Sequence, residues 1–166
     1  GDGSPAINYH MQWNTTTARA DGSSNHYVWG GVAPDATHFS VGPAANPDRT
    51  NNSNSDYVAM LFANVDGICK CGYYDGSSYD VTISDVGFQP RFVLIKIRTA
   101  NDNWRVLDTT RGWGAGNDCQ IRLSSASAQS CNDDWGAPTP TGFSLTASSD
   151  TAYNGNGYGY IYYAHA

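Results

Sequence analysis

The sequence contains no glutamate, two lysines and five leucines among its 166 residues. These residue types are strong helix formers, so their scarcity argues against helices of ordinary length, as do 18 glycines. Tyrosine, tryptophan, valine, isoleucine and threonine, which suit strands, are frequent instead. The composition therefore predicts an all-β protein.

Basic residues and long apolar runs are also lacking. Nine Lys and Arg stand against 15 acidic residues, all of them Asp, which gives a net charge of -6. Nucleic-acid binding normally needs a basic patch, and a membrane span needs a run of about 20 apolar residues. We therefore expect no nucleic acid among the partners and no membrane insertion.

Aliphatic residues are scarce too, but 11 Tyr and five Trp supply the missing apolar volume. Each of these side chains can bury roughly 150–250 Å² and also carries a polar group. We therefore expect a folded chain with an aromatic core or an aromatic surface.

Strands are indicated by residues that alternate between apolar and polar, as in residues 7–14. Residues 91–98 are almost wholly apolar and follow Pro90, which is typical of a central strand covered on both faces. Lys96 lies inside this run, and we expect Asp108 to form a buried ion pair with Lys96 or with Arg111 that fixes the geometry of a loop. A pair that contacts a ligand is the alternative. Further strands are expected at residues 37–41, 57–63, 68–74, 79–83, 104–108, 119–123, 143–146 and 158–164.

The chain also repeats itself. Residues 11–13, 29–30, 39–41 and 57–63 recur as residues 121–123, 135–136, 143–145 and 160–166, at offsets of 110, 106, 104 and 103. Each half ends on the same kind of strand after an Asn-rich turn, although two aromatic hairpins can also look alike by chance. The repeat predicts that residues 65–166 form one complete β-sandwich repeat and that residues 1–64 are the second half of a preceding one.

Five motifs of residues 65–166 follow one another in a recognisable order. They are Gly72-Tyr-Tyr-Asp-Gly76, Gly87-Phe-Gln-Pro90 before the apolar strand, Trp104 with Asp108-Thr-Thr-Arg111-Gly112, Gly142-Phe-Ser-Leu145, and Gly159-Tyr-Ile161. Together they resemble a repeat domain of bacteriophage tail-fibre-like proteins from phages of aquatic and cyanobacterial hosts. The resemblance implies a fibre or adhesin on the virion surface and brings no catalytic residues with it.

The four cysteines, Cys69, Cys71, Cys119 and Cys131, depart from the pattern of that repeat and are candidates for disulfides. Cys69 and Cys71 share one face of a strand, so a bond between them would be strained, which favours pairing each with Cys119 or Cys131. Cys119 is in phase with Ile121 and Leu123, which predicts that it faces the core. Free buried thiols and a zinc site are the alternatives, although the spacing lacks the usual CxxC unit.

A glycan site would combine exposed aromatic rings, which stack on sugar rings, with Asp or Asn side chains that accept hydroxyl hydrogen bonds. Aromatic residues in Gly-rich segments and an acidic pair beside one of them are the candidate contacts: Trp29, Trp113, Asp133, Asp134, Trp135 and Tyr153. A solvated loop tip is the alternative for the acidic pair. The histidines are scattered and no complete calcium loop is present, so we predict no catalytic residue, metal or cofactor.

These observations predict an antiparallel β-sandwich made of one complete repeat plus a preceding half repeat. A half repeat leaves strand edges unpaired, so we expect a homo-oligomer or fibre formed by strand complementation. The expected function is a non-enzymatic structural or receptor-binding fibre protein of a bacteriophage-like virion, extracellular or on the virion surface, that contacts host surface glycans. The alternatives are a secreted filament-forming or adhesin subunit without a virus, and a glycan-active hydrolase.

Overall fold

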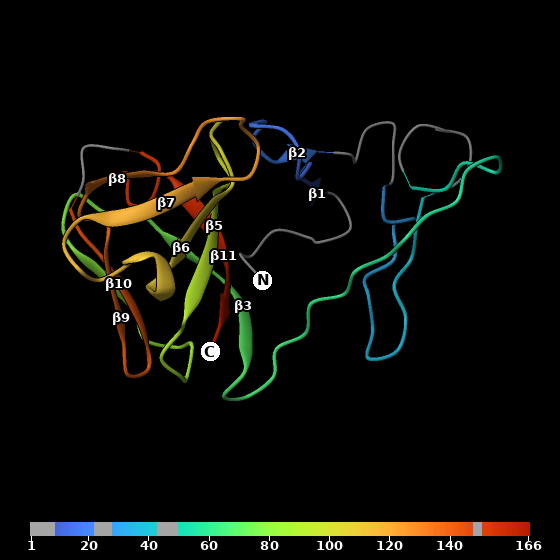
Figure 1. Ribbon diagram of the computed structural model, residues 1–166. Coiled ribbons are helices and arrows are strands. Elements are labelled where there is room, and N and C mark those ends of the chain that lie inside the picture. Colours follow the sequence, from blue (N-terminus) through green and yellow to red (C-terminus); the bar gives the residue numbers. More distant parts are fainter. Residues whose placement is uncertain (1–8, 22–27, 43–49, 148–150) are drawn as a thin grey trace. The chain divides into compact units, whose positions relative to one another are not determined.

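The computed structural model describes residues 9–21, 28–42, 50–147 and 151–166, and it divides into two compact units (Figure 1). The smaller unit comprises Gly1–Met11 and Arg19–Leu61, and the larger one comprises Gln12–Ala18 and Phe62–Ala166. Among the described residues the regular elements are strands and one 3-10 helix, Thr109–Arg111. The all-β class predicted from the composition is confirmed.

The larger unit contains a six-stranded antiparallel sheet in the order β3-β11-β5-β6-β7-β8. The last strand in the chain, β11, is paired along both of its edges, with β3 on one side and β5 on the other. The run predicted to be a central strand is β5, which is buried along almost its whole length, so that prediction is confirmed. The strands are β3 (Cys69–Asp75), β5 (Phe92–Ile97), β6 (Arg105–Asp108), β7 (Asp118–Arg122), β8 (Ser130–Asp133) and β11 (Gly159–His165).

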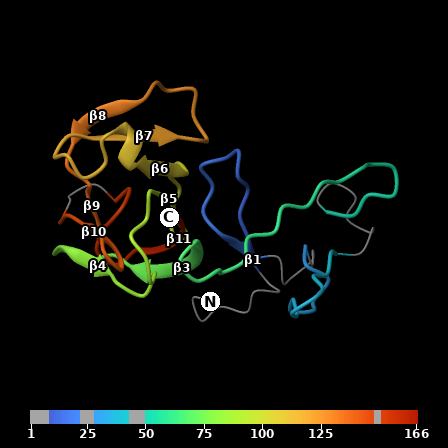
Figure 2. The same ribbon diagram turned by 60° about the horizontal axis from the view of Figure 1, so that its bottom comes forward.

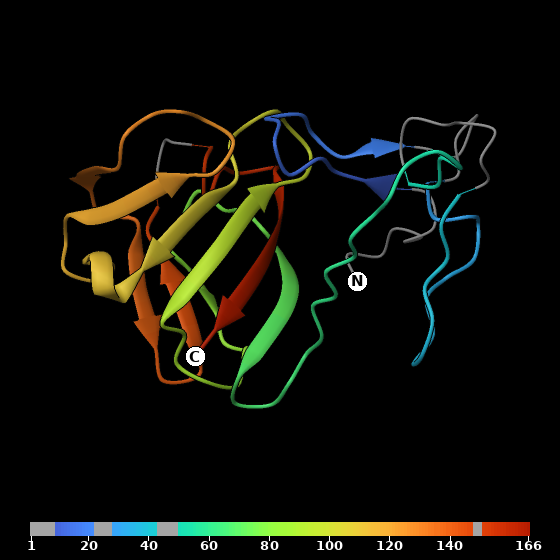
Figure 3. The ribbon, with the colours of Figure 1, turned by 45° about the vertical axis from the view of Figure 1, so that its right-hand side comes forward.

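A second, three-stranded antiparallel sheet in the order β4-β10-β9 packs against the first, as Figures 2 and 3 show from two directions. It consists of β4 (Val81–Ile83), β9 (Gly136–Thr139) and β10 (Gly142–Leu145). The buried side chains of both sheets form one hydrophobic cluster. The predicted antiparallel β-sandwich is therefore confirmed for the larger unit.

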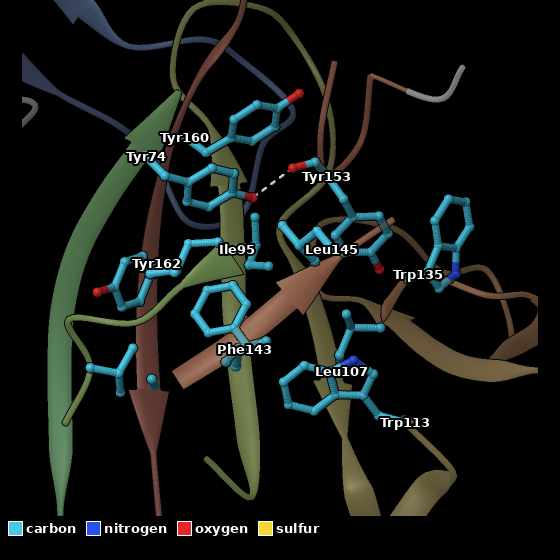
Figure 4. Close-up of a cluster of buried hydrophobic side chains, with 14 of the residues drawn as sticks. Tyr74, Ile95, Leu107, Trp113, Trp135, Phe143, Leu145, Tyr153, Tyr160 and Tyr162 are labelled. Carbon is cyan, nitrogen blue, oxygen red and sulfur yellow. Dashed lines mark hydrogen bonds between the residues drawn. The ribbon is translucent and has the colours of Figure 1, made fainter. Parts of the chain in front are cut away.

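Aromatic side chains fill much of the space between the sheets (Figure 4). Tyr74 stacks on Tyr160 with ring centroids 4.9 Å apart, and Phe143 meets Tyr162 edge to face at 5.3 Å. Such pairs add about 0.5–1.5 kcal/mol to the stabilisation from burial. Gly72 makes room for one of them, because a Cβ at that position would lie 2.4 Å from the hydroxyl of Tyr162. A core of this kind explains how the chain folds with so few aliphatic residues.

Residues 12–18 lie against the outer face of the six-stranded sheet. Trp13 stacks on Trp104 at 5.0 Å, and the Lys96 ammonium donates hydrogen bonds to the backbone oxygens of Thr16 (3.1 Å) and Asp102 (2.8 Å). Burial lowers the pKa of Lys96, and the nearby charge of Asp102 partly opposes that shift.

The ion pair expected between Asp108 and Lys96 or Arg111 is wrong. Asp108 pairs with Arg91 at 3.2 Å. The register explains the choice, because Asp108 lies opposite Phe92 at the start of β5, whereas Lys96 lies near its other end.

The smaller unit has less regular structure than its alternation predicts. Among its described residues the strands are β1 (Tyr9–His10) and β2 (Ala20–Asp21), and residues 37–41 and 57–61 are not strands. Residues 62 and 63, which belong to the larger unit, are not strands either. In the larger unit, the sequence pattern does not predict β8 and β9, because β8 is mostly polar and β9 contains a glycine and a proline. A strand-like sequence needs a neighbouring strand before it can form a ladder, and residues 57–63 have none in the part of the chain that the structure describes.

The β1–β2 hairpin nevertheless pairs in the same register as β7–β8. His10 lies opposite Ala20, and Gln120 lies opposite Ser130, so both partners are shifted by 110 residues. This is the same offset that the sequence repeat has at that point.

Candidate functional site

Three of the aromatic residues predicted to contact a glycan are buried in the core. Trp113, Trp135 and Tyr153 are only 3%, 6% and 1% exposed. The Trp135 and Tyr153 rings lie 4.8 Å apart and contribute to the core with Trp113, as Figure 4 shows. A sugar ring cannot reach these faces, so the prediction that they are exposed is wrong. Their Gly-rich surroundings are turns that fold over the sandwich.

The remaining three candidates lie nearer the surface. Trp29, in the smaller unit, is half-buried, and its indole N–H donates to the backbone oxygen of Tyr9 at 2.8 Å. Asp133 and Asp134 are exposed at the end of β8, and one oxygen of Asp134 accepts the N–H of Gly136 at 3.1 Å. Only these three can meet a ligand from solvent without rearrangement of the core.

The structure also contains buried polar groups that sequence analysis missed. Asp118 is fully buried, and its two carboxylate oxygens accept the backbone N–H groups of Gly114 (2.7 Å), Trp135 (2.7 Å) and Gly136 (3.2 Å). The carboxylate therefore ties together the loop before β7 and the turn before β9. The burial of Asp118 could not be predicted from the sequence, because Asp118 and Gln120 occupy alternate positions of β7, as polar residues on a solvent-facing strand surface do.

A second buried network connects the sheet to the loop that carries Tyr153. Arg105 donates to both oxygens of Asp102, at 3.0 and 3.1 Å, and to the side-chain oxygen of Gln120. That oxygen also accepts the Tyr153 hydroxyl at 3.1 Å. Three donors in this network thus find acceptors within it, while the buried Arg105 Nε has no hydrogen-bond partner among the described residues.

The cysteines pair differently from the prediction. Cys119 and Cys131 form a disulfide between the neighbouring strands β7 and β8, while Cys69 and Cys71 on β3 are free thiols. Strands in a sheet are about 4.8 Å apart, so β3 lies about 19 Å from β7, whereas a disulfide needs Cα atoms within about 7 Å. The expected bonds between the two pairs are therefore wrong. The expected inward orientation of Cys119 is wrong too, because the residues on either side of it, Asp118 and Gln120, are the buried ones. Burial, reinforced by Cys69, raises the pKa of the Cys71 thiol.

The most unusual surface belongs to residues 57–61 of the smaller unit, which we call the open segment. Its apolar side chains are in water: Val58, Met60 and Leu61 are 94%, 76% and 75% exposed. No backbone–backbone hydrogen bond joins its residues to any other described residue. Burying one such side chain contributes about 1.5–3 kcal/mol, so a partner that covered this segment would be bound with a favourable hydrophobic contribution.

The turn before the open segment copies a turn of the larger unit. The N–H of Asn52 donates to the Tyr57 hydroxyl at 2.9 Å, as the N–H of Gly155 donates to the Tyr160 hydroxyl at 2.8 Å. The N–H of Ser55 likewise donates to the backbone oxygen of Asn52, at the same 3.2 Å that separates the equivalent atoms 103 residues later.

Two further contacts match at nearly the same offset. The Asn51 amide donates to the backbone oxygen of Gly42 at 3.0 Å, as the Asn154 amide donates to that of Thr146 at 3.2 Å. A Cβ on Gly30 would meet the Val41 oxygen at 2.8 Å, as one on Gly136 would meet the backbone of the equivalent strand, β10.

The two copies of this turn differ in what covers them. Tyr160 is fully buried beneath β3, whereas Tyr57 is 50% exposed, and Asn51 is exposed where Asn154 is fully buried. The described part of the smaller unit therefore shares individual turn contacts with the second half of the sandwich, but its Tyr57 and Asn51 are not covered as Tyr160 and Asn154 are.

Within the described ranges, no group of three or more His, Cys, Asp or Glu side chains is arranged to hold a metal ion. The same residues contain no helix of the length and apolarity that crossing a bilayer requires.

A family model matches residues 4–166, which is almost the whole chain. No match to the chain was found among the curated proteins or the solved structures. The match covers both units and each contact described above, and the chain therefore belongs to the family described as a domain of unknown function, DUF7483.

Proposed function

We propose that this chain is a non-enzymatic structural module of a repetitive, fibre-like protein on the surface of a bacteriophage-like virion. The observation that carries the proposal is the recurrence, in the smaller unit, of hydrogen bonds found in the second half of the sandwich. A chain that repeats one packing unit builds length by adding units, which is the property a fibre needs. The phage setting is supported by the resemblance of residues 65–166 to tail-fibre-like repeats.

The same recurrence supports the division of the chain into residues 1–64, the second half of a preceding repeat, and residues 65–166, a complete repeat. The matched contacts extend from the first hairpin of the smaller unit to its final segment, and they keep the order of the sequence repeat. A pair of unrelated aromatic hairpins would have no reason to share them.

In this proposal, neighbouring units complete one another's sheets to form a homo-oligomer or fibre. The open segment supports this, because it presents strand-forming residues without a pairing partner among the described residues. Size-exclusion chromatography with light scattering tests self-association. A stable monomer at micromolar concentration would contradict it.

The contacts of buried Asp118 and of half-buried Asp102 support a structural role over a hydrolytic one. Asp118 is occupied by backbone N–H groups and Asp102 by Arg105. A glycosidase needs two carboxyl groups facing each other across a substrate. Incubating purified protein with host glycans and analysing the products tests this alternative, and released sugar would overturn the structural proposal.

Recognition of a host glycan remains part of the proposal through Trp29, Asp133 and Asp134, each of which is at least partly accessible. A glycan array of the wild type and of a D133A/D134A variant tests it. Loss of a specific signal in a variant of unchanged stability would support the site, and an unchanged signal would remove the acidic pair from it.

Imaging decides whether the protein is a fibre. Virions or cell-surface filaments labelled with an antibody fragment against residues 65–166 should carry gold at regular intervals along a fibre. Label confined to dispersed protein would refute the proposal. Label on filaments of virus-free cells would favour the alternative of a secreted filament or adhesin subunit.

A further inference from the structure

The geometry points to a specific occupant for the open segment and the turn before it: an additional first half of this β repeat, a polypeptide resembling residues 69–97 with β3, β4 and β5. This inference rests on the proposed repeat organisation and names the partner that completes it.

In the larger unit, the connection from β3 to β4 covers the turn before β11 through the backbone. The N–H of Gly76 donates to the oxygen of Tyr158 at 2.8 Å, and the N–H of Ser77 donates to the side-chain oxygen of Asn154 at 2.9 Å. The Asn154 amide in turn donates to the backbone oxygen of Tyr79 at 2.9 Å. One asparagine thus holds the connecting loop from both sides.

The side chains of β3 complete this contact. The Tyr74 ring stacks on Tyr160, with an interplanar angle of 7°. Gly76 is required for the close approach, because a Cβ there would lie 2.1 Å from the backbone oxygen of Gly155. This turn therefore recognises a Tyr-x-Gly sequence together with two backbone groups that follow it, the N–H of the next residue and the oxygen of the residue two positions further on.

The smaller unit presents the same recognising groups. Asn51, Ser55 and Tyr57 occupy the positions of Asn154, Tyr158 and Tyr160, and the turn that holds them has the same internal hydrogen bonds. Beyond the turn, the open segment corresponds to β11, which is paired on both edges in the larger unit. The site is thus shaped for a β3-like strand on one edge and a β5-like strand on the other.

Identical copies of residues 1–166 can associate, but they cannot cover both second halves of each copy at once. The described residues contain two second halves, one in each unit, and one first half, which is already paired within the larger unit. If a second copy donated its first half, its own β11 would lose its partners. A first half additional to the one in this chain is therefore needed.

The test supplies that half in cis. A second copy of residues 65–118 is fused ahead of Gly1 of the full chain, and hydrogen–deuterium exchange is followed at residues 57–61, with the amides of β11 in the same molecule as an internal standard. The matched control carries Gly76→Leu in the added copy only, which blocks the close approach to the turn while leaving the larger unit intact.

We expect exchange at residues 57–61 to slow by about 100-fold or more in the fusion, and to stay fast in the control and in the unfused chain. Fast exchange in the fusion while β11 is protected would overturn the inference. Protection already present in the unfused chain would overturn it too, and light scattering of a dimer would then identify a second copy as the occupant. Fibres seen by imaging without protection in the fusion would leave the proposed function standing and refute only the named partner.

Discussion

Replacing Asp118 by alanine removes the acceptor of three backbone N–H groups from a fully buried position. Gly136 keeps a second acceptor in Asp134, so two N–H groups, those of Gly114 and Trp135, are left without a partner. Each unsatisfied buried donor costs about 1–3 kcal/mol, which places the loss of unfolding free energy at about 2–6 kcal/mol. In a domain of about 100 residues, each 1 kcal/mol lowers Tm by roughly 4–8 °C.

The D118N variant should be less damaging. Its single amide oxygen can still accept from Trp135 and Gly136, but its NH₂ group then faces the N–H of Gly114. One donor is left unsatisfied, for an expected loss of about 1–3 kcal/mol. This variant also keeps the measurement possible if D118A does not fold.

The matched control is D133A, which removes the same charge from an exposed position on the neighbouring strand β8. Its effect should stay within about 0.5 kcal/mol. Urea unfolding at 25 °C, followed by tryptophan fluorescence and far-UV circular dichroism, gives all three values. If D118A unfolds within 0.5 kcal/mol of D133A, the argument that this carboxylate holds the two loops together is refuted.

Three further predictions use the same unfolding assay. The C131S variant should lose about 3 kcal/mol, because it opens the disulfide to Cys119 that closes a short loop, and reductant should weaken the wild type but not the variant. W135A should lose about 3–5 kcal/mol as a core truncation; a variant of normal stability that lost only glycan binding would contradict the burial of Trp135. Burial raises the pKa of Tyr74 in the folded state well above its ordinary value of 10.0. The stability that comes from keeping this hydroxyl neutral is therefore fully present below pH 10 and is lost as the pH rises toward the pKa of the folded state. Absorbance at 295 nm should therefore show Tyr74 ionising only with unfolding, and Y74F should remove that part of the alkaline loss; free titration of every tyrosine near pH 10 in the folded state would contradict this.

Part of the fold follows from local pattern. An almost wholly apolar strand such as β5 has little surface that favours water on either face, so its central position could be predicted from residues 91–98. The repeat could be found in the same way, because matching residues at offsets near 103–110 need no knowledge of contacts. Scarce helix formers and abundant strand formers were enough to predict the class.

The candidate site was less predictable. Exposure of Trp113, Trp135 and Tyr153 was inferred from neighbouring glycines, but glycine marks a turn and does not say on which side of the turn a ring lies. The open segment was predicted as a strand, and its sequence is strand-forming, but a ladder depends on residues far away in the chain. The Asn-rich turn was visible in the sequence, whereas the role of Asn51 emerges only from comparison with the contacts of Asn154.

The sequence by itself determined the all-β class, the central strand and the period of the repeat, because each depends on residue types and their spacing. The tertiary structure alone decided which face of β7 turns inward, where polar Asp118 took the place expected for Cys119. It also decided the disulfide, since the order of strands places Cys131 beside Cys119 and leaves Cys69 near the opposite edge of the sheet. Alternation defines two faces of a strand, but only the packing of distant segments selects the face that is buried and the neighbour that is paired.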